Sequence, residues 1–219
     1  MAGMPESGKG QRRIGAPDAK NRTLLLDAAE QLLVTAGAGA VSSRRVAEQA
    51  GLKHQLVHYY FRTMDDLFLA VFRRRGDQGL QEQAAVLESP QPLWALWRFN
   101  NDTAGTALTM QFIALANERE GLRAEIASYA ERLRAEQIET VAGLLTRYGI
   151  DDEEFSATVL MVLMTSASRM LIIEQEALGM RLGHAETVEF VERWLRRLEG
   201  EPGDPAAGAA TVSSGRAAH

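Results

Sequence analysis

The chain has 219 residues, enough for one ordinary domain and one smaller domain that each bury a core. It contains no cysteine, which excludes disulfides and thiolate metal sites and favours a reducing compartment, so we expect a cytoplasmic protein. The basic N-terminal stretch lacks the apolar core of a signal peptide, and no later stretch is apolar for long enough to cross a bilayer, so we expect a soluble protein without membrane contact.

The formal net charge of −5 is unevenly distributed along the chain. Residues 1–75 contain 12 Lys and Arg against 7 Asp and Glu, a balance of +5, whereas the remainder contains 12 against 22, a balance of −10. A basic head on an acidic body is the distribution expected when only the head meets phosphates. Chance asymmetry between two solvated surfaces gives the same split, so charge alone decides nothing.

The two ends of the chain lack helical periodicity. Residues 1–20 form a basic arm rich in Gly, Ser and Pro, and residues 201–219 are rich in Ala, Gly, Ser and Pro, so we expect both to be disordered. Between them, apolar residues recur at helical spacing without an alternating strand pattern, which predicts an all-α fold. The prolines at 89–92 interrupt this pattern most clearly. We therefore expect an N-terminal domain at 21–82 and a C-terminal domain at 83–200.

The first predicted helix runs from about Asn21 to Ala36 and ends at Gly37. A short helix follows, capped by Ser42 or Ser43 and ended by Gly51. A second short helix is predicted at 53–60. A fourth helix is predicted at 63–87, with Thr63 and Asp66 in a capping arrangement at its start.

Two short helices joined by a tight glycine turn, with a longer helix on each side, form the arrangement of a helix-turn-helix DNA-binding domain. Residues 25–72 closely resemble the N-terminal domain of the TetR family of repressors. The resemblance is carried by Leu26, Ala29, Leu32, Leu33 and Gly37 in the first helix, by Ser43–Leu52, by His58-Tyr59-Tyr60-Phe61, and by Asp65-Asp66-Leu67. It implies a homodimeric regulator that binds double-stranded DNA with this domain and senses a small molecule with a helical remainder.

The second short helix has two chemically different faces. Val57, Tyr60 and Phe61 share one face and are expected to pack inward. The opposite face carries polar side chains with Leu56 at its margin. Gln55 is suited to pair with adenine, and Leu56 to touch a thymine methyl group.

Other members of the predicted interface are expected to contact the DNA backbone, or in the case of His54 either a base or a phosphate. His54 can donate to a base acceptor or to a phosphate, and His58 and Tyr59 can bond phosphate oxygens. The family resemblance adds backbone and flanking contacts from the start of the first short helix and from Lys53. The complete predicted set is Ser42, Ser43, Arg44, Lys53, His54, Gln55, Leu56, His58 and Tyr59.

Three positions depart from the usual pattern of the family. His58 stands where a phosphate-binding Tyr is common, Met64 where a Lys is common, and Lys53 where a Ser cap is common. The substitution at Met64 weakens the expected backbone anchoring. His54 and His58 have the spacing of a helical metal pair, but without a third ligand we expect no metal and no cofactor.

The remaining helices are predicted at about 93–100, 103–117, 121–148, 152–177 and 185–199, with glycine at 121, 149, 179 and 183 as punctuation. The acidic run 151–154 suits a helix start. The helix at 152–177 is unusually apolar and contains small residues, so with the helix at 185–199 it is expected to form an intersubunit four-helix bundle. Burial of these two helices within one chain is the alternative, and the two are not exclusive.

A ligand pocket is expected among the helices between 93 and 173, where aromatic and methionine side chains supply apolar surface and Asn and Thr side chains could orient a ligand. The candidate lining residues are Trp97, Asn100, Thr106, Met110, Asn117, Met164, Thr165 and Arg169. Arg169 lies within an apolar stretch, so it is expected to meet either an anionic ligand or a glutamate such as Glu174 or Glu118.

The function predicted from these features is that of a sequence-specific transcriptional regulator. We expect a repressor that is released from a palindromic operator by a small, largely apolar effector. The alternatives are an effector-independent DNA-binding protein and a ligand-dependent activator. An enzyme is not expected, because the sequence offers neither a nucleophile with a base nor a metal cluster.

Overall fold

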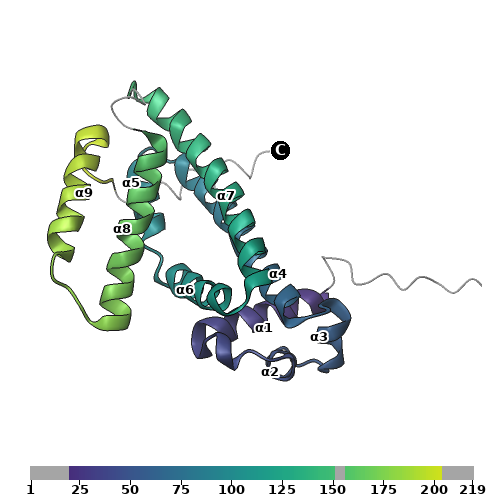
Figure 1. Cartoon of the computed structure of the whole chain (residues 1–219). Coiled ribbons are helices and arrows are strands. Elements are labelled where there is room, and N and C mark those ends of the chain that lie inside the picture. The colour runs from purple at the N-terminus through teal and green to yellow at the C-terminus, as the bar shows by residue number, and fades with distance from the viewer. Residues whose placement is uncertain (1–19, 151–155, 204–219) are drawn as a thin grey trace, which may run out of the picture. The chain divides into compact units, whose positions relative to one another are not determined.

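The computed structural model describes residues 20–150 and 156–203 of the chain. These residues form helices and no β-strand, as the all-α prediction required (Figure 1). In chain order the elements are α1 (Lys20–Ala36), η1 (Ala38–Ala40), α2 (Ser43–Gln49), α3 (Gln55–Tyr60), α4 (Met64–Leu87), α5 (Pro92–Asn100), α6 (Thr103–Glu118), α7 (Glu120–Arg147), α8 (Ala157–Leu178) and α9 (His184–Glu199).

The chain divides into two compact units, residues 1–71 and 72–219, with the boundary inside α4. The boundary expected from the sequence lies after residue 82. The two differ because the second part of α4 already packs within the second unit. There the ring of Phe72 lies edge-on to the rings of Phe112 and Tyr129, with centroids 5.0 and 5.7 Å apart.

The first unit contains α1, η1, α2, α3 and the beginning of α4. Helix α1 packs against both α2 and α3, which also pack against each other, so α1 is the stabilising helix of the arrangement. The apolar spacing read from the sequence corresponds to the buried side chains, which are Leu25, Leu26, Ala28, Ala29, Leu32, Leu33, Val46, Ala47, Val57, Phe61, Leu67, Phe68 and Val71.

Side-chain caps fix where two helices of this unit begin. Ser42 caps α2, since its Oγ accepts from the backbone N–H of Arg45 at 3.3 Å. At the start of α4, the backbone N–H of Thr63 donates to Asp66 Oδ2 at 3.0 Å, and the backbone N–H of Asp66 donates to Thr63 Oγ1 at 3.0 Å. The predicted reciprocal cap is therefore confirmed, and it satisfies two N–H groups that the helix leaves unbonded.

The second unit has its core where α5, α7, α8 and α9 meet. Helix α8 packs against α5, α6 and α7, and α5 also packs against α9 (Figure 1). The core contains Leu87, Leu93, Trp94, Leu96, Trp97, Val141, Leu144, Leu145, Ala157, Leu160, Met161, Met164 and Leu195. The apolar stripe of α9 packs against this core from within the same chain, so burial within the monomer holds for that stripe.

The end of α9 is bonded to the beginning of α5. The carboxylate of Glu199 accepts from the backbone N–H groups of Leu93 and Trp94 at 2.9 and 3.0 Å. The side chain of Gln91 donates to the backbone carbonyls of Glu199 and Glu201 and accepts from the N–H of Gly203. Residues 201–203, which belong to the predicted tail at 201–219, therefore contribute polar contacts at the start of α5. The rest of the tail lies outside the described residues.

Other helix limits also differ from the prediction. Gly121 lies inside α7, and the break between α6 and α7 falls at Arg119, whose backbone is extended. The side chain of Arg123 donates to the carbonyl of Ala116 at 2.9 Å, so a polar group of α7 completes the end of α6. Lys20, placed in the predicted arm, is the first residue of α1. The remainder of the arm and the acidic run 151–154 lie outside the described residues.

The expectation that no segment could cross a bilayer needs correction at α8. This helix is long and apolar enough to do so by length and composition alone. Its apolar residues also have another role, because α8 is the helix that packs against α5, α6 and α7. Part of its apolar surface is explained by packing within the chain, since Leu160, Met161 and Met164 are buried.

Candidate DNA interface and ligand cavity

A tight turn between α2 and α3 sets the direction in which α3 leaves. Gly51 has a φ of +65°, the left-handed region that glycine adopts without steric cost. The backbone N–H of Leu52 donates to the carbonyl of Ala47 at 2.8 Å, and the N–H of Gly51 donates to that of Glu48 at 3.1 Å. The last carbonyls of α2 are thus satisfied by the turn itself.

One face of α3 is held by the core of the first unit. Val57 is 1% exposed and Phe61, directly after the helix, is 3% exposed. The guanidinium of Arg22 on α1 lies over the ring of Phe61, 5.2 Å from its centroid. The inward face predicted for this helix is therefore confirmed for these two residues, and Tyr60 is half-buried.

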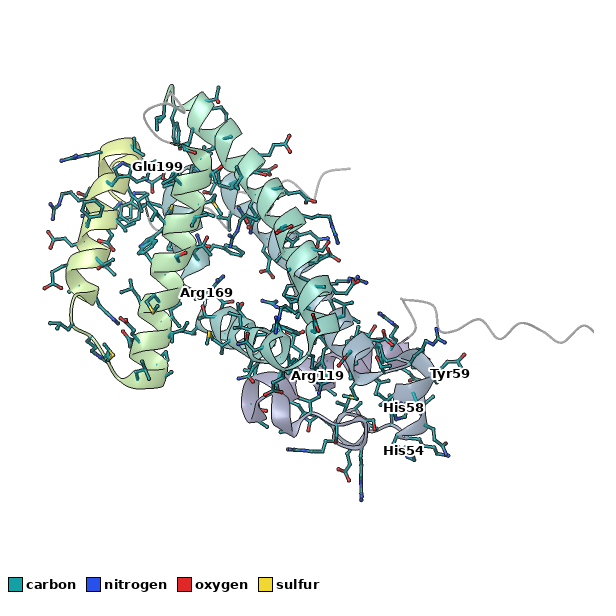
Figure 2. The ribbon with its side chains drawn as sticks, in the orientation of Figure 1. His54, His58, Tyr59, Arg119, Arg169 and Glu199 are labelled. Atoms are coloured by element: carbon teal, nitrogen blue, oxygen red, sulfur yellow. The ribbon has the colours of Figure 1, made fainter. Side chains whose placement is uncertain are left out.

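The other face of α3 is open to solvent. His58 and Tyr59 are exposed on the helix, as is His54 at its N-cap (Figure 2). Gln55 is also exposed, and Leu56 is half-buried. The imidazole of His54 forms no capping hydrogen bond to α3. The face therefore presents an amide, two imidazoles and a phenol, which together donate and accept hydrogen bonds.

The remaining predicted contact residues lie just before α3 and at the start of α2. Ser42, Arg44 and Lys53 are exposed, and Ser43 is half-buried. Across the full predicted set, seven side chains are thus exposed and two are half-buried. The fold gathers this set around the turn between α2 and α3.

The spacing of His54 and His58 is not matched by a third ligand. Within residues 20–150 and 156–203, no three His, Cys, Asp or Glu side chains are grouped so that they could hold a metal ion.

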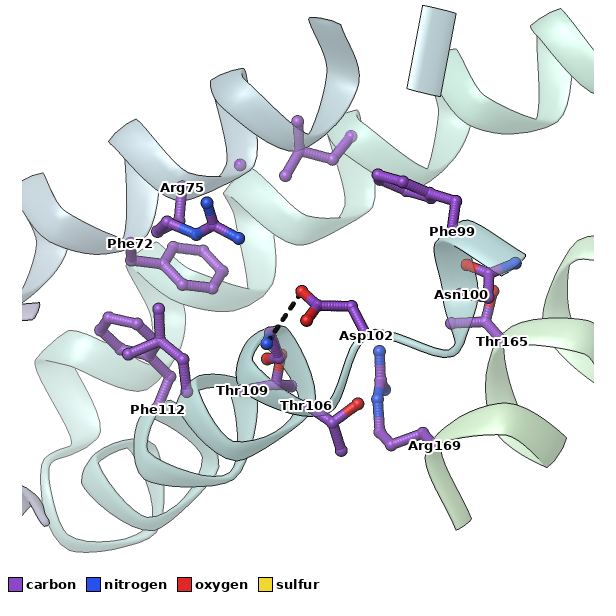
Figure 3. Close-up of a pocket in the computed structure, with 14 residues that line it drawn as sticks. Phe72, Arg75, Phe99, Asn100, Asp102, Thr106, Thr109, Phe112, Thr165 and Arg169 are labelled. Carbon is purple, nitrogen blue, oxygen red and sulfur yellow. Dashed lines mark hydrogen bonds between the residues drawn. The ribbon is translucent and has the colours of Figure 1, made fainter. Parts of the chain in front are cut away.

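The second unit contains a cavity of about 240 Å³ (Figure 3). Its residues come from α4, α5, α6, α7 and α8 and from the turn between α5 and α6. The apolar wall consists of Phe72, Phe99, Leu108, Phe112 and Leu133. The polar side chains are Arg75, Asn100, Asp102, Thr106, Thr109, Thr165 and Arg169.

Half of the predicted pocket residues line this cavity, namely Asn100, Thr106, Thr165 and Arg169. The other four do not. Trp97 and Met164 belong to the core of the second unit, whereas Met110 and Asn117 are exposed. All eight lie on predicted helices, and the sequence did not show which turn of each helix faces inward.

The cavity is also lined by side chains that are absent from the predicted set, among them Phe72, Arg75 and Asp102. Phe72 and Arg75 belong to α4, which was assigned to the other domain up to residue 82. Asp102 is the N-cap of α6, and its carboxylate accepts from the backbone N–H groups of Ala104 and Gly105 at 3.0 and 2.9 Å. An aspartate directly before a helix is a recognisable cap, and that signal was available in the sequence.

Arg169 is half-buried and its side chain points from α8 into the cavity (Figure 3). Burial, followed by the nearby positive charge of Arg134, lowers the pKa of Arg169. Neither predicted glutamate pairs with it: Glu118 is exposed, and Glu174 Oε2 lies 2.9 Å from His184 Nε2. In the described part of the chain, no carboxylate forms an ion pair with Arg169.

Tyr129 of α7 ties that helix to α4 beside the cavity. Its hydroxyl donates to the carbonyl of Arg73 at 3.0 Å and contacts the carboxylate of Asp77. Burial and the hydrogen bond with Asp77 raise the pKa of Tyr129 to about 12, so its hydroxyl stays protonated at neutral pH.

Residues 25–71 match the family model of bacterial regulatory proteins of the tetR family. No match was found among curated protein sequences.

Solved structures share the fold over most of the chain. The fatty acid degradation regulator FadR from Bacillus halodurans has 14% identity and a TM-score of 0.65, covering 82% of this chain and 96% of its own. FadR from Bacillus subtilis, solved in complex with stearoyl-CoA, has 14% identity and a TM-score of 0.61, covering 82% and 99%. A transcriptional regulator from Rhodococcus sp. Rha1 has 19% identity and a TM-score of 0.61, covering 82% and 94%.

Proposed function

Because the chain belongs to the tetR family of DNA-binding transcriptional regulators, we propose that it is a repressor released from a palindromic operator by a small, largely apolar effector. The family is one of regulators rather than enzymes. The observation that carries the proposal is the exposed polar face of α3, held by a buried apolar face in a helix-turn-helix.

The chemistry of that face supports reading of DNA sequence by α3. Gln55 presents an amide, which bonds adenine through two hydrogen bonds in the major groove. Arg44 and Lys53 are exposed cations that flank it and supply sequence-independent contacts with phosphates. We therefore assign base reading to Gln55, with His54 and Leu56, and backbone contacts to the other members of the set.

A palindromic operator requires two copies of α3 related by a two-fold axis. The exposed apolar residues of α8 and α9 support a homodimer through these helices. Val159, Leu163 and Met170 are spaced along one side of α8, and Phe190 of α9 is 69% exposed. Such side chains are removed from water when a second copy covers them, as in an intersubunit four-helix bundle.

The cavity of the second unit supports control by a small molecule. Drug-sized ligands occupy pockets of about 300–1,000 Å³, and this cavity of about 240 Å³ therefore suits a compact ligand rather than a long acyl-CoA such as the stearoyl-CoA bound by FadR of Bacillus subtilis. The cavity also favours the ligand-responsive repressor over an effector-independent DNA-binding protein. A ligand-dependent activator would use the same site, but its ligand would strengthen DNA binding instead of weakening it.

Helix α4 is the proposed route from ligand to DNA. It begins in the first unit, and its residues Phe72, Arg75 and Gly76 line the cavity of the second. An effector that binds the non-DNA-binding state tenfold more tightly shifts the equilibrium by about 1.4 kcal/mol, within the usual coupling range of about 1–3 kcal/mol. A regulator of this kind works where the DNA is, so we place the protein in the cytoplasm.

The proposal is tested by binding selection with the full-length protein on randomised duplex DNA. We expect enrichment of a palindrome whose half-sites are about 10 base pairs apart from centre to centre. Recovery of unrelated sequences, with weak binding that salt abolishes, would contradict a sequence-reading α3.

A further inference from the structure

We propose that the cavity binds a small carboxylic acid, with its carboxylate held by Arg169 and Asn100 and its apolar body packed against Phe72 and Phe112. The inference rests on the proposed function in one respect, because it takes the cavity to be the effector site. A cavity of about 150 Å³ accommodates benzene, so a cavity of about 240 Å³ has room for a ring and a short acidic side chain.

The first argument is the charge of Arg169, which forms no ion pair within residues 20–150 and 156–203. A half-buried guanidinium loses hydration, and the positive charge of Arg134 adds repulsion. Among the described residues no carboxylate compensates for this loss. A ligand carboxylate would do so with two parallel N–H···O bonds, the geometry for which a guanidinium is suited.

The second argument is an unsatisfied donor on the same cavity wall. The side-chain amide nitrogen of Asn100, at the end of α5, is buried and forms no hydrogen bond with any residue that the structure describes. Its residue lines the cavity together with Thr165, which lies four residues before Arg169 and so on the same face of α8 (Figure 3). An amide, a hydroxyl and a guanidinium together provide donors for both oxygens of a carboxylate.

Asp102 is the residue that could oppose an anion in this cavity. Both of its oxygens accept from backbone N–H groups at the start of α6, where the helix dipole favours a negative charge. The guanidinium of Arg169 lines the same cavity, whereas the carboxylate of Asp102 is already bonded to the backbone. The balance therefore favours an anionic ligand over a cationic one.

The aromatic wall of the cavity indicates the chemical nature of the rest of the ligand. The rings of Phe72 and Phe112 meet edge to face with centroids 5.0 Å apart, and Phe99 adds a third aromatic side chain. Aromatic and short branched aliphatic groups pack well against such rings. The ligand class is thus an aryl or short-chain monocarboxylic acid.

The test uses three probes that share one body and differ in the head group, namely 3-phenylpropanoate, 3-phenylpropan-1-ol and 3-phenylpropylamine. Each is titrated calorimetrically into the full-length protein at neutral pH. We expect the acid to bind at least about tenfold more tightly than the alcohol, because it forms charge-assisted hydrogen bonds, and we expect the amine to bind most weakly.

Two variants assign this preference to the cavity. Arg169→Met should abolish the preference for the acid, whereas Arg98→Met, which removes an exposed arginine of α5 outside the cavity, should retain it. Arg169→Met should also raise the melting temperature of the ligand-free protein, since it removes a poorly compensated charge. A merely structural arginine would give a lower melting temperature instead.

The outcomes separate this inference from the proposed function. Equal or tighter binding of the alcohol or the amine, or an acid preference that survives Arg169→Met, overturns the carboxylate while leaving a ligand site in place. Failure of all three probes to bind also overturns it. The DNA selection needs no ligand, and its result therefore decides the DNA-binding part of the proposed function independently.

Discussion

Gln55 is the first residue of α3, and Lys53 lies two residues before it. Both side chains are exposed, yet they should have different roles in DNA binding. Gln55→Ala should relax preference at one base pair of each half-site, with a loss of about 1–3 kcal/mol on the best sequence. Lys53→Ala should weaken binding to all sequences and reduce the slope of log K against log salt by about one unit per subunit. Selection profiles and salt titrations of both variants check this. Identical specificity profiles would refute the division of roles.

The turn that orients α3 depends on a backbone conformation rather than on a side chain. Gly51→Ala should reduce the free energy of unfolding by roughly 1–2 kcal/mol, because φ is +65° there. Gly39→Ala is the matched control, since a Cβ would meet nothing within 4 Å and the residue does not have a positive φ. Urea unfolding of both variants measures the difference. Equal stability would mean that the turn rearranges without cost.

At the level of elements, side chains of α7 lie directly against the backbone of α4 at Gly76. A Cβ there would lie 2.6 Å from Tyr129 Cε1 and 2.7 Å from Leu133 Cδ1. Gly76→Ala should therefore destabilise the protein by about 1–3 kcal/mol, the usual cost of overpacking. Gly79→Ala, one turn further along α4, meets nothing within 4 Å and should stabilise the helix by about 0.5–1 kcal/mol. Thermal unfolding should show opposite signs for the two, and a shared sign would contradict the close approach.

The helices were predictable where a short local signal defined them. Thr63 with Asp66 marked the start of α4 by a reciprocal cap, and Gly37 marked the end of α1. The limits of α6 and α7 were not predictable in this way, because Arg123 completes the end of α6 from the next helix and Gly121 is accommodated inside α7. A local glycine signal therefore fails where a side chain of the following helix completes the helix end instead.

The DNA interface and the cavity also differ in how far their residues lie from one another in the sequence. The residues around the α2–α3 turn are close in sequence, so a single pattern brought them together. The cavity is assembled from five helices, and Arg75 and Asp102 reach it from α4 and from the cap of α6. Periodicity identifies which residues share a face of one helix, but not which turns of different helices meet. Half of the predicted pocket residues were therefore placed elsewhere.

At the scale of the whole molecule, the proposed homodimer depends on the exposed apolar side of α8. Leu163→Glu should convert the protein from a dimer of two 24.0 kDa chains to a monomer, because a carboxylate would be buried at the interface. Ile113→Glu is the control, since Ile113 is an exposed apolar residue of α6 outside that surface. Light scattering after size exclusion distinguishes the two. A Leu163→Glu dimer would exclude this face as the interface.

Loss of the dimer should also lower affinity for DNA. A monomer contacts one half-site and therefore forms about half of the phosphate and base contacts, so the salt dependence should fall with the affinity. Leu163→Glu leaves the DNA-facing set unchanged, and binding by this variant should resemble that of the wild-type protein to a single half-site. Wild-type affinity for the palindrome would separate DNA binding from dimerisation.

The central claim is that two copies of α3 read two half-sites in successive major grooves. It is tested most directly by comparing the dissociation constant for the selected palindrome with that for the same palindrome carrying five additional base pairs between its half-sites. The insertion turns one half-site to the opposite face of the duplex. We predict that binding weakens by roughly a hundredfold or more, towards the non-specific level. Unchanged affinity would contradict a dimeric helix-turn-helix repressor.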